Sequence, residues 1–359
     1  MKLQRHIQMS FAGNYVERRT RKNVFFRQID EIIDWSLIEK EIDKIYKKGQ
    51  SVDGRPSYRG IVLFKMMLLQ TWYNLSDPAV EDMVNDSLGA MRFCQLELED
   101  DVPDHSTLSR FRKELVEKKA FDRLLRKINS QLKAKGIMIK QGSAKVDASI
   151  TDSPFSPKGK TEYEISSDRK EDDRDDEHKQ KEEQTQEVIR KTKPGVDSEG
   201  RWLKKAGKLH YGYKKHIAVD KDGLAEAVHT TPANEHDSRG LEKVMEKVKK
   251  EKKLQVFADK GYKVPDNDAY IKGQKIKNRI QHKAYRNRPL TSWEILFNKL
   301  ISKQRWVVER TFGGMSRWFG AGKARYKGLA KVHGQHVLEA IAYNLKRSPG
   351  LVWVKCAQK

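Results

Sequence analysis

The chain has 359 residues and a formal net charge of +23 at neutral pH. This length suffices for two domains, or for one large domain with an appended module. The excess of Lys and Arg favours a polyanionic partner such as nucleic acid over a neutral small molecule. The longest apolar run, residues 61–69, is interrupted by Lys65 and is far shorter than the roughly 18 residues that cross a bilayer, so no membrane span is expected.

The cysteines and the N-terminal sequence bear on the cellular compartment. Only Cys94 and Cys356 are present, far apart in the chain, which argues against a disulfide framework and against a cysteine-based zinc site. The first residues lack the apolar segment of a secretory signal. We therefore expect a cytoplasmic protein, associated with the nucleoid if its partner is DNA.

Residues 1–29 are predicted to form a basic N-terminal arm, and residues 30–140 a wholly helical domain for DNA binding or dimerisation. Residues 37–46 space their isoleucines as a helix does, and Ser76 is a candidate N-cap. The arm could insert into a DNA groove, although generic surface charge is an equal interpretation. Its candidate DNA-binding residues are Arg18, Arg19 and Arg21.

A further helix is predicted to begin near residue 106, with Ser106 or Asp104 as its N-cap. This helix could be a recognition helix that reads DNA. Its candidate DNA-binding residues are Arg110, Arg112 and Lys113.

From residue 143 the pattern changes to that of strands. Residues 143–150 alternate apolar and polar side chains, which is the period of a strand. Further strands are predicted at residues 210–220, 224–231 and 254–262, with a helix before the last of them. This order is typical of a mixed α/β sheet. We therefore place an α/β domain at residues 141–350 and a C-terminal tail at residues 351–359.

An acidic insertion at about residues 154–209 separates the first two of these strands. Residues 162–187 contain 12 acidic and 5 basic side chains, in contrast to the rest of the chain. Such a polar run cannot bury enough surface to order itself alone, so a solvated hairpin or a disordered loop is the preferred interpretation. The alternative is a DNA mimic that shields the basic surface.

Three carboxylates form a candidate metal site. Asp147 lies inside a predicted strand, where aspartate is disfavoured, and Asp259 ends another strand. Glu309 on a helix is the natural third ligand. Oxygen ligands suit magnesium or manganese, and two such ions can serve phosphodiester chemistry. The alternatives are a surface ion pair of Glu309 with Arg305, caps of turns, and Asp152 in place of Asp147.

The helix that carries Glu309 has two predicted faces. The core side is predicted to contain Trp293, Leu296, Phe297, Leu300, Ile301, Val307 and Val308. The other face contains Ser302, Arg305, Glu309, Gly313 and Ser316. Glycine in a helix costs roughly 1 kcal/mol relative to alanine, so a phosphate backbone approaching over the glycine is a candidate reason for it.

Other basic and aromatic residues could bind DNA through phosphate contacts and stacking. Strand alternation sends Lys214 and His216 to one face and Lys215 to the other, and a packed histidine is an equal interpretation of His216. The remaining candidates are Lys260, Tyr262, Lys323, Arg325 and Tyr326, for which a solvated basic face or a shaped turn is the alternative.

Several ordered motifs resemble the catalytic domain of bacterial insertion-sequence transposases of the DDE type, family five. These motifs are VDASITDSP, HYGYKKHIAVD, TTPANEHDS, ADKGY and RWVVERTFGGMSRWFG. VPDHSTLSRFRKEL and the helices before it resemble the helical N-terminal domain of the same enzymes. The resemblance implies a ribonuclease H-like fold, with two Mg²⁺ (or Mn²⁺) ions bound by Asp147, Asp259 and Glu309.

The family signature is only partly retained. Related transposases often show Tyr, two residues, Arg, three residues, Glu, six residues, Lys. The Arg and Glu fit here, but Ser302 replaces the Tyr and Ser316 replaces the Lys. Arg317 or Lys323 could substitute for the phosphate contact of that Lys.

By this resemblance the chain is expected to cleave double-stranded DNA at terminal inverted repeats and to join the freed end to target DNA. A complex that holds two DNA ends implies a homodimer. The alternatives are a non-catalytic DNA-binding relic of such an element, and a nuclease of the same fold that only hydrolyses strands.

Overall fold

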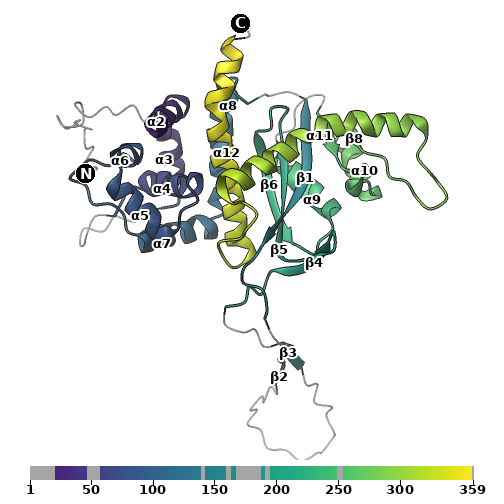
Figure 1. The fold of residues 1–359 in the computed structure, drawn as a ribbon, viewed down its shortest axis with the longest axis horizontal. Coiled ribbons are helices and arrows are strands. Elements are labelled where there is room, and N and C mark those ends of the chain that lie inside the picture. The colour runs from purple at the N-terminus through teal and green to yellow at the C-terminus, as the bar shows by residue number, and fades with distance from the viewer. Residues whose placement is uncertain are drawn as a thin grey trace, which may run out of the picture.

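The structure is a computed structural model that describes residues 21–46, 57–138, 142–158, 163–166, 187–190, 195–248 and 254–357. A group of helices lies beside a sheet, and the long helix α12 (Leu329–Ala357) passes between them (Figure 1). Within the described ranges, no helix is both long and apolar enough to cross a membrane.

The N-terminal part is helical, as its sequence predicts. Its elements are α2 (Arg21–Ile32), α3 (Trp35–Asp43), α4 (Gly60–Trp72), α5 (Asp77–Asp86), α6 (Leu88–Phe93), α7 (His105–Glu117) and α8 (Ala120–Ala134). Every residue of α4 is buried, which makes it the centre of this helical group. Ser76 caps α5 as predicted. Of the two candidate caps for α7, Asp104 is the one whose side chain accepts from the Thr107 amide.

The basic arm differs from its sequence prediction. Residues 21–29 belong to α2, and Phe26 and Ile29 are buried in the helical core. An amphipathic helix with apolar residues at a three-residue spacing gains more from burial than from remaining an arm. Arg18 and Arg19 lie outside the described residues.

The second part contains a six-stranded mixed sheet. Its strands are β1 (Ser143–Asp152), β4 (Arg201–Lys205), β5 (Lys208–Val219), β6 (Ala225–Pro232), β7 (Gln255–Ala258) and β8 (Lys277–Ile280). The order is β4-β5-β1-β7-β8, and β6 pairs with β5 as well. β1 runs antiparallel to β5 and parallel to β7, and β7 runs parallel to β8. The predicted strands are therefore present, while β4 and β8 were not predicted.

Helices cover both faces of this sheet (Figure 1). They are η1 (Asp237–Arg239), α9 (Gly240–Lys247), η2 (Lys260–Tyr262), α10 (Pro265–Gly273), α11 (Ser292–Phe319) and α12. One face packs its apolar side chains against α9 and α10, and α11 and α12 lie across the other. The α/β sheet with flanking helices and the helical N-terminal part confirm the predicted fold class.

One apolar core crosses the boundary that the sequence predicted near residue 140. A single cluster of buried side chains runs from Phe26 in α2 to Leu345 in α12 and includes Ile217 and Val228 of the sheet. The indole Nε1 of Trp72 donates a hydrogen bond to a backbone carbonyl of α12 at 2.9 Å. The helical group and the sheet are thus packed as one body through α12.

The first half of α11 departs from the predicted core side. Trp293, Leu296 and Leu300 are exposed, whereas Ile301, Val307 and Val308 are buried as predicted. Figure 1 shows the reason, because the first half of α11 runs outward past the edge of the sheet. Only the second half lies over the sheet.

The acidic insertion contributes three strands. β2 (Tyr163–Ser166) and β3 (Glu187–Arg190) form an antiparallel pair away from the body of the protein (Figure 1). β4 instead joins the main sheet beside β5. Most of the acidic run lies outside the described residues.

Candidate active site

Asp147 lies in the middle of β1, opposite Ile217 of β5. On its other side β1 pairs with β7 only as far as Lys145, so the sheet opens beside Asp147. Burial raises the pKa of Asp147, and the negative charges of Asp259 and Glu309 add to this, while the guanidinium of Arg305 opposes it. The strand therefore holds a carboxylate that needs a cation.

Asp259 follows β7 directly, at the end of the strand that neighbours β1. Its side chain caps η2 by accepting from the Lys260 amide. It is more exposed than Asp147, with 40% of its side chain accessible against 20%. The parallel register of β1 and β7 sets Lys145 opposite Phe257, so two residues further along each strand Asp147 and Asp259 lie side by side.

Arg305 joins the two aspartates from α11. Its Nη2 atom lies 3.0 Å from Oδ2 of Asp147, and Nη1 lies 4.0 Å from Oδ1 of Asp259. The arginine is buried and its Nε atom has no hydrogen-bond partner. Glu309 lies one turn further along the same helix and is exposed. Helix α11 therefore presents both a carboxylate and a positively charged guanidinium to the aspartates of the two strands.

A magnesium or manganese ion suits this donor set. The three side chains are all carboxylates, which hard divalent cations prefer, and a buried guanidinium already holds positive charge between two of them. Among the described residues, no group of three His, Cys, Asp or Glu side chains is drawn together closely enough to hold a metal ion. Arg305 lies between the two aspartates, 3.0 Å from Asp147 and 4.0 Å from Asp259.

Tyr262 and Asp237 complete the surroundings of Asp147. Tyr262 is 1% exposed, and its hydroxyl has no hydrogen-bond partner. Burial, then the charge of Asp147, then that of Asp237 raise the pKa of this phenol well above its usual value. Sequence reasoning missed Asp237, whose only signal is its place in the motif TTPANEHDS. It also proposed Tyr262 for DNA contacts, which a buried side chain cannot make in this structure.

Lys214 and His216 face α9 and not the surface. Lys214 pairs with Asp237 at 2.8 Å, and His216 contacts the Thr231 hydroxyl at 3.0 Å. Both are buried, and burial lowers the pKa of His216 to about 4. Strand alternation was predicted correctly, but the face it selects is covered by η1 and α9. The packed interpretation of His216 therefore fits the structure.

Arg112 is buried, and Tyr326, which it contacts, is half-buried. The Arg112 guanidinium bonds Asp77 at 2.7 Å and Gln70 at 3.2 Å, and it lies over the Tyr326 ring. Arg325 donates to the backbone carbonyl of residue 75 at 2.6 Å. These side chains join the helical group to the loop after α11. Arg112 is buried there, whereas Arg325 and Tyr326 are partly exposed, and their DNA contacts stay a prediction.

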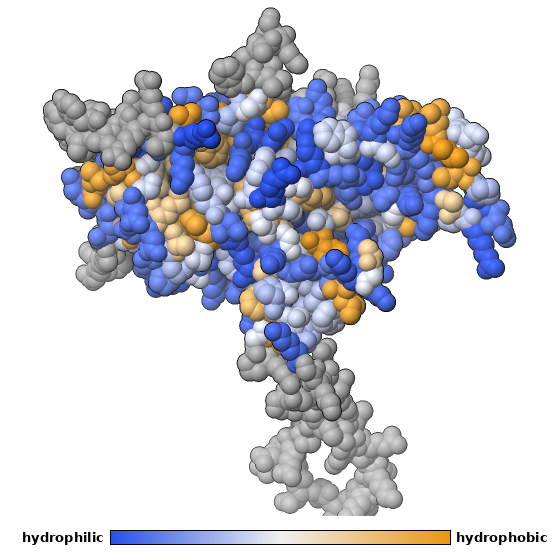
Figure 2. Space-filling view, viewed as in Figure 1, coloured by the Kyte–Doolittle hydropathy of each residue, from blue (hydrophilic) through white to orange (hydrophobic). Residues whose placement is uncertain are grey.

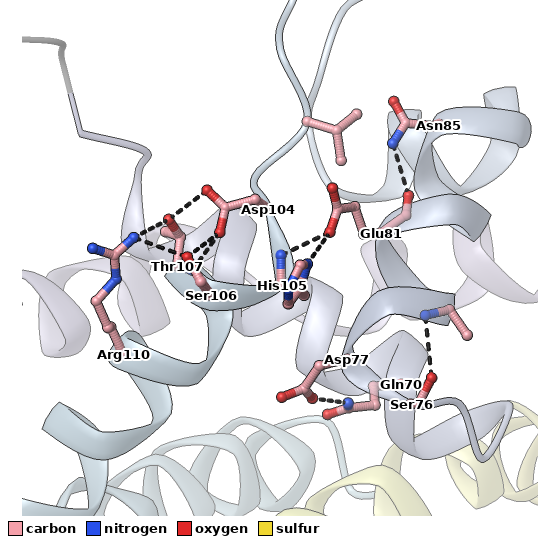
Figure 3. A network of polar contacts seen from close by, with 12 residues as sticks. Gln70, Ser76, Asp77, Glu81, Asn85, Asp104, His105, Ser106, Thr107 and Arg110 are labelled. Atoms are coloured by element: carbon pink, nitrogen blue, oxygen red, sulfur yellow. Dashed lines mark hydrogen bonds and ion pairs between the residues drawn. The ribbon is translucent and has the colours of Figure 1, made fainter.

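The outer face of α7 retains two of its predicted cations. Arg110 contacts the hydroxyls of Ser106 and Thr107, each at 3.1 Å (Figure 3). Lys113 is exposed as well. The Ser106 hydroxyl, with the Thr107 amide, lowers the pKa of the N-cap Asp104 to about 2, so this cap is ionised at neutral pH.

The remaining candidate cations lie on the surface. The exposed ones are Arg21, Lys260, Arg317 and Lys323. Lys260 follows Asp259 directly, and Arg317 lies two turns beyond Glu309 on α11. Gly313 lies between Glu309 and Arg317 with open space around it, whereas a side chain at Gly314 would meet the Tyr343 ring at 2.8 Å.

Comparisons with known proteins show which family the sequence resembles. A family model described as "Transposase DDE domain" matches residues 177–345, and one described as "Transposase domain (DUF772)" matches residues 14–114. The chain is 36% identical over 240 residues to a "Transposase for insertion sequence element IS1106" from Neisseria meningitidis serogroup B. This match covers 67% of the chain and 76% of the relative. No solved structure matches.

The DDE match implies a ribonuclease H-like sheet, and the two aspartates lie where its inner strands β1 and β7 separate, which is the arrangement of a nucleic-acid-processing enzyme. The chain belongs to the DDE transposases of insertion sequences. DNA is therefore its partner. The DDE model includes Asp259 and Glu309 but begins after Asp147, so the first acid of the site rests on its position beside Asp259 and Arg305.

Proposed function

We propose that this transposase cleaves DNA at the terminal inverted repeats of its element and joins the freed end to target DNA. In this proposal Asp147, Asp259 and Glu309 bind two Mg²⁺ or Mn²⁺ ions. The observation that carries it is the position of Arg305 between Asp147 and Asp259, since a buried cation there marks a place that holds positive charge. Two ions bound at these acids would stabilise the attacking and leaving oxygens.

The residues of the chain orient the reaction. β1 fixes Asp147, the capped turn after β7 fixes Asp259, and α11 fixes Glu309. In the first step the oxygen of water bonds to phosphorus while the bond to the 3′ oxygen breaks, which leaves a free 3′-hydroxyl. In the second step that hydroxyl bonds to a phosphorus of the target, its proton passes to solvent, and the 3′ oxygen of the target strand leaves.

The exposed cations around the acids supply the proposed DNA contacts. Lys260 and Arg317 flank the acids, and Lys323 lies on the loop after α11. Arg110 and Lys113 form a second group on the outer face of α7, and Arg21 begins α2. Such contacts position the duplex without reading its sequence. Two DNA ends are proposed to be held by a homodimer.

The test is a cleavage and strand-transfer assay with magnesium on DNA that carries the flanks of the gene. Asp147→Asn, Asp259→Asn and Glu309→Gln are expected to abolish both steps, as is a chelator. Asp152→Asn is the matched control, because Asp152 lies on the same strand but pairs with His210 at 2.9 Å. This control is expected to retain activity.

Each of the other possible results of this assay would support a different function or a different first acid. Cleavage without joining would indicate a nuclease of the same fold. Flank-specific binding without cleavage by the unaltered protein would indicate a binding relic. Loss of activity in Asp152→Asn with activity retained in Asp147→Asn would transfer the first acid to Asp152.

A further inference from the structure

The outer half of α11 carries an apolar seam whose side chains are largely exposed. The ring of its Trp293 stacks on Phe297 at 5.2 Å and meets the His282 ring edge-on at 5.7 Å. We define the seam as Trp293, Leu296, Leu300 and Lys303. Its three apolar side chains are 63%, 56% and 53% exposed. Figure 2 shows hydrophobic side chains gathered at the upper right edge, where Figure 1 places this half of the helix.

The seam has the spacing of a helix-pairing surface. Its positions follow one another by three, four and three residues, which is the a and d pattern of a coiled coil. The next position in the series, Val307, is buried against the body of the protein. One line of side chains, apolar at every position except Lys303, thus runs along α11 and is covered at Val307 and open before it.

We infer that the seam binds the same seam of a second copy of this chain, in antiparallel orientation. A two-fold axis pairs residue i of one copy with residue j of the other, and j with i. With the axis midway between positions 296 and 300, each Leu296 meets Leu300 of the partner subunit. The same axis sets each Trp293 opposite Lys303 of the partner subunit.

The residue types of the seam fit this pairing. Its middle is then entirely leucine, and each end brings a lysine ammonium to an indole face, which is a favourable cation–π contact. A parallel pairing would set Lys303 against Lys303 of the partner subunit, which is repulsive. DNA is a poorer occupant, because three of the four seam residues offer nothing to a phosphate.

The seam deepens the proposed function, since the homodimer there needs a contact surface. Lys303 precedes Glu309 by six residues on an unbroken helix. Pairing at the seam would therefore fix the two active sites relative to each other. The seam spans about 15 Å of helix, so we expect the pairing to be weak in free protein and stronger when two copies are held on joined DNA ends.

Sedimentation equilibrium of the full chain in a chelator tests the pairing without any catalysis. The unaltered protein is expected to associate reversibly, and Leu296→Glu with Leu300→Glu to weaken that association about tenfold or more. Ile295→Glu is the matched control, because Ile295 is also 56% exposed but points away from the seam. Equal association of the double variant and the control would overturn the inference, as would an unaltered protein that stays monomeric even on joined DNA ends.

Cysteine substitutions test the orientation. In a Cys356→Ser background, a mixture of Leu296→Cys and Leu300→Cys proteins is expected to form disulfides between the two variants several-fold more than within either. An excess within each variant would indicate parallel pairing and overturn the antiparallel arrangement. If the Leu296→Glu, Leu300→Glu protein associates as strongly as the unaltered protein but binds a short duplex more weakly, the seam would be assigned to DNA. Because these measurements involve no cleavage, failed catalysis would contradict the proposed function alone.

Discussion

Arg305 and Asp147 form an ion pair of 3.0 Å between α11 and β1, in which the arginine side chain is 10% and the aspartate 20% exposed. A second, longer approach of 4.0 Å joins the same guanidinium to Asp259. The guanidinium of Arg305 on α11 therefore balances the negative charges of both aspartates of the sheet. If metal ions bind these acids as proposed, they compete with Arg305 for the same carboxylate oxygens.

Arg305→Gln is the first prediction. The substitution leaves Asp147 without its cation, so the free energy of unfolding is expected to fall by about 1–3 kcal/mol in a chelator. Mg²⁺ is expected to restore part of this loss and to bind more tightly than in the unaltered protein. Thermal melts with and without Mg²⁺, together with calorimetric titration, measure both effects. Arg317→Gln on the same helix is the control, and an equal loss with and without Mg²⁺ would refute the competition.

Arg112→Met tests the interior assignment of Arg112. Removing the guanidinium leaves Asp77 half-buried and unpaired, so we expect the unfolding free energy to drop by about 3 kcal/mol. Arg110→Met on the exposed side of α7 is expected to change stability by less than about 0.5 kcal/mol and to weaken DNA binding with a shallower salt dependence. Urea unfolding and DNA titrations at several salt concentrations separate the two. A purely DNA-binding defect in Arg112→Met would contradict the assignment.

Acid is predicted to destabilise the sheet through the buried His216 and the half-buried His229. Burial lowers the pKa of His216 to about 4 and that of His229 to about 3, below their ordinary value of 6.5. A lowered histidine pKa means that the folded state prefers the neutral ring. The contribution of the neutral ring to the free energy of unfolding is therefore complete above pH 6.5, and it is lost as the pH falls toward 4. One pKa unit corresponds to about 1.4 kcal/mol.

His216→Gln can keep the contact with Thr231 without titrating. We expect the melting temperature of this variant to fall less than that of the unaltered protein between pH 7.5 and pH 5. His105→Gln, at an exposed position, serves as the control. Identical pH profiles for the unaltered protein and His216→Gln would show that the buried ring does not contribute.

The two glycines of α11 are predicted to respond in opposite directions. Gly313→Ala meets open space and removes a poor helix former, so it is expected to stabilise the protein by up to about 1 kcal/mol. Gly314→Ala meets the Tyr343 ring and is expected to destabilise it. If DNA approaches over Gly313, the alanine there will weaken DNA binding despite its gain in stability. Melting temperatures and DNA titrations of both variants decide this.

Tyr262→Phe removes a buried hydroxyl that has no partner in this structure. Because an unsatisfied buried hydroxyl costs about 1–3 kcal/mol, the variant is expected to be at least as stable as the unaltered protein. DNA affinity is expected to stay unchanged, since the ring is inaccessible. A lower melting temperature would mean that the hydroxyl has a stabilising partner.

The sequence predicted the parts of the fold that follow local patterns. Strand alternation around Asp147 and the end of a strand at Asp259 were readable, because period and termination are local properties. Which charged side chains are exposed and which are buried could not be predicted from the sequence. Arg110 and Arg112 stand two residues apart on one helix, yet one is exposed and the other pairs with Asp77, which depends on how α5 and α7 pack.

The same limit explains the first half of α11. Periodicity shows which side of a helix is apolar, and it gave the same face to Leu296 and Val307. It does not show how far the sheet beneath that helix extends. Leu296 lies beyond the edge of the sheet, so the predicted core side is a surface there. Likewise, the pairing of Arg305 with Asp147 joins residues that only the tertiary fold brings together.

The course of α12 has a consequence for synthesis on the ribosome. This last helix supplies one side of the apolar cluster that begins at Phe26, and Trp72 donates its indole hydrogen bond to it. The N-terminal helices therefore emerge long before the surface that covers them. Until residues 329–345 leave the exit tunnel, a nascent chain has apolar side chains of α2 and α4 without their final contacts. Premature termination before α12 would leave that surface open, so truncated products are candidates for chaperone binding and proteolysis.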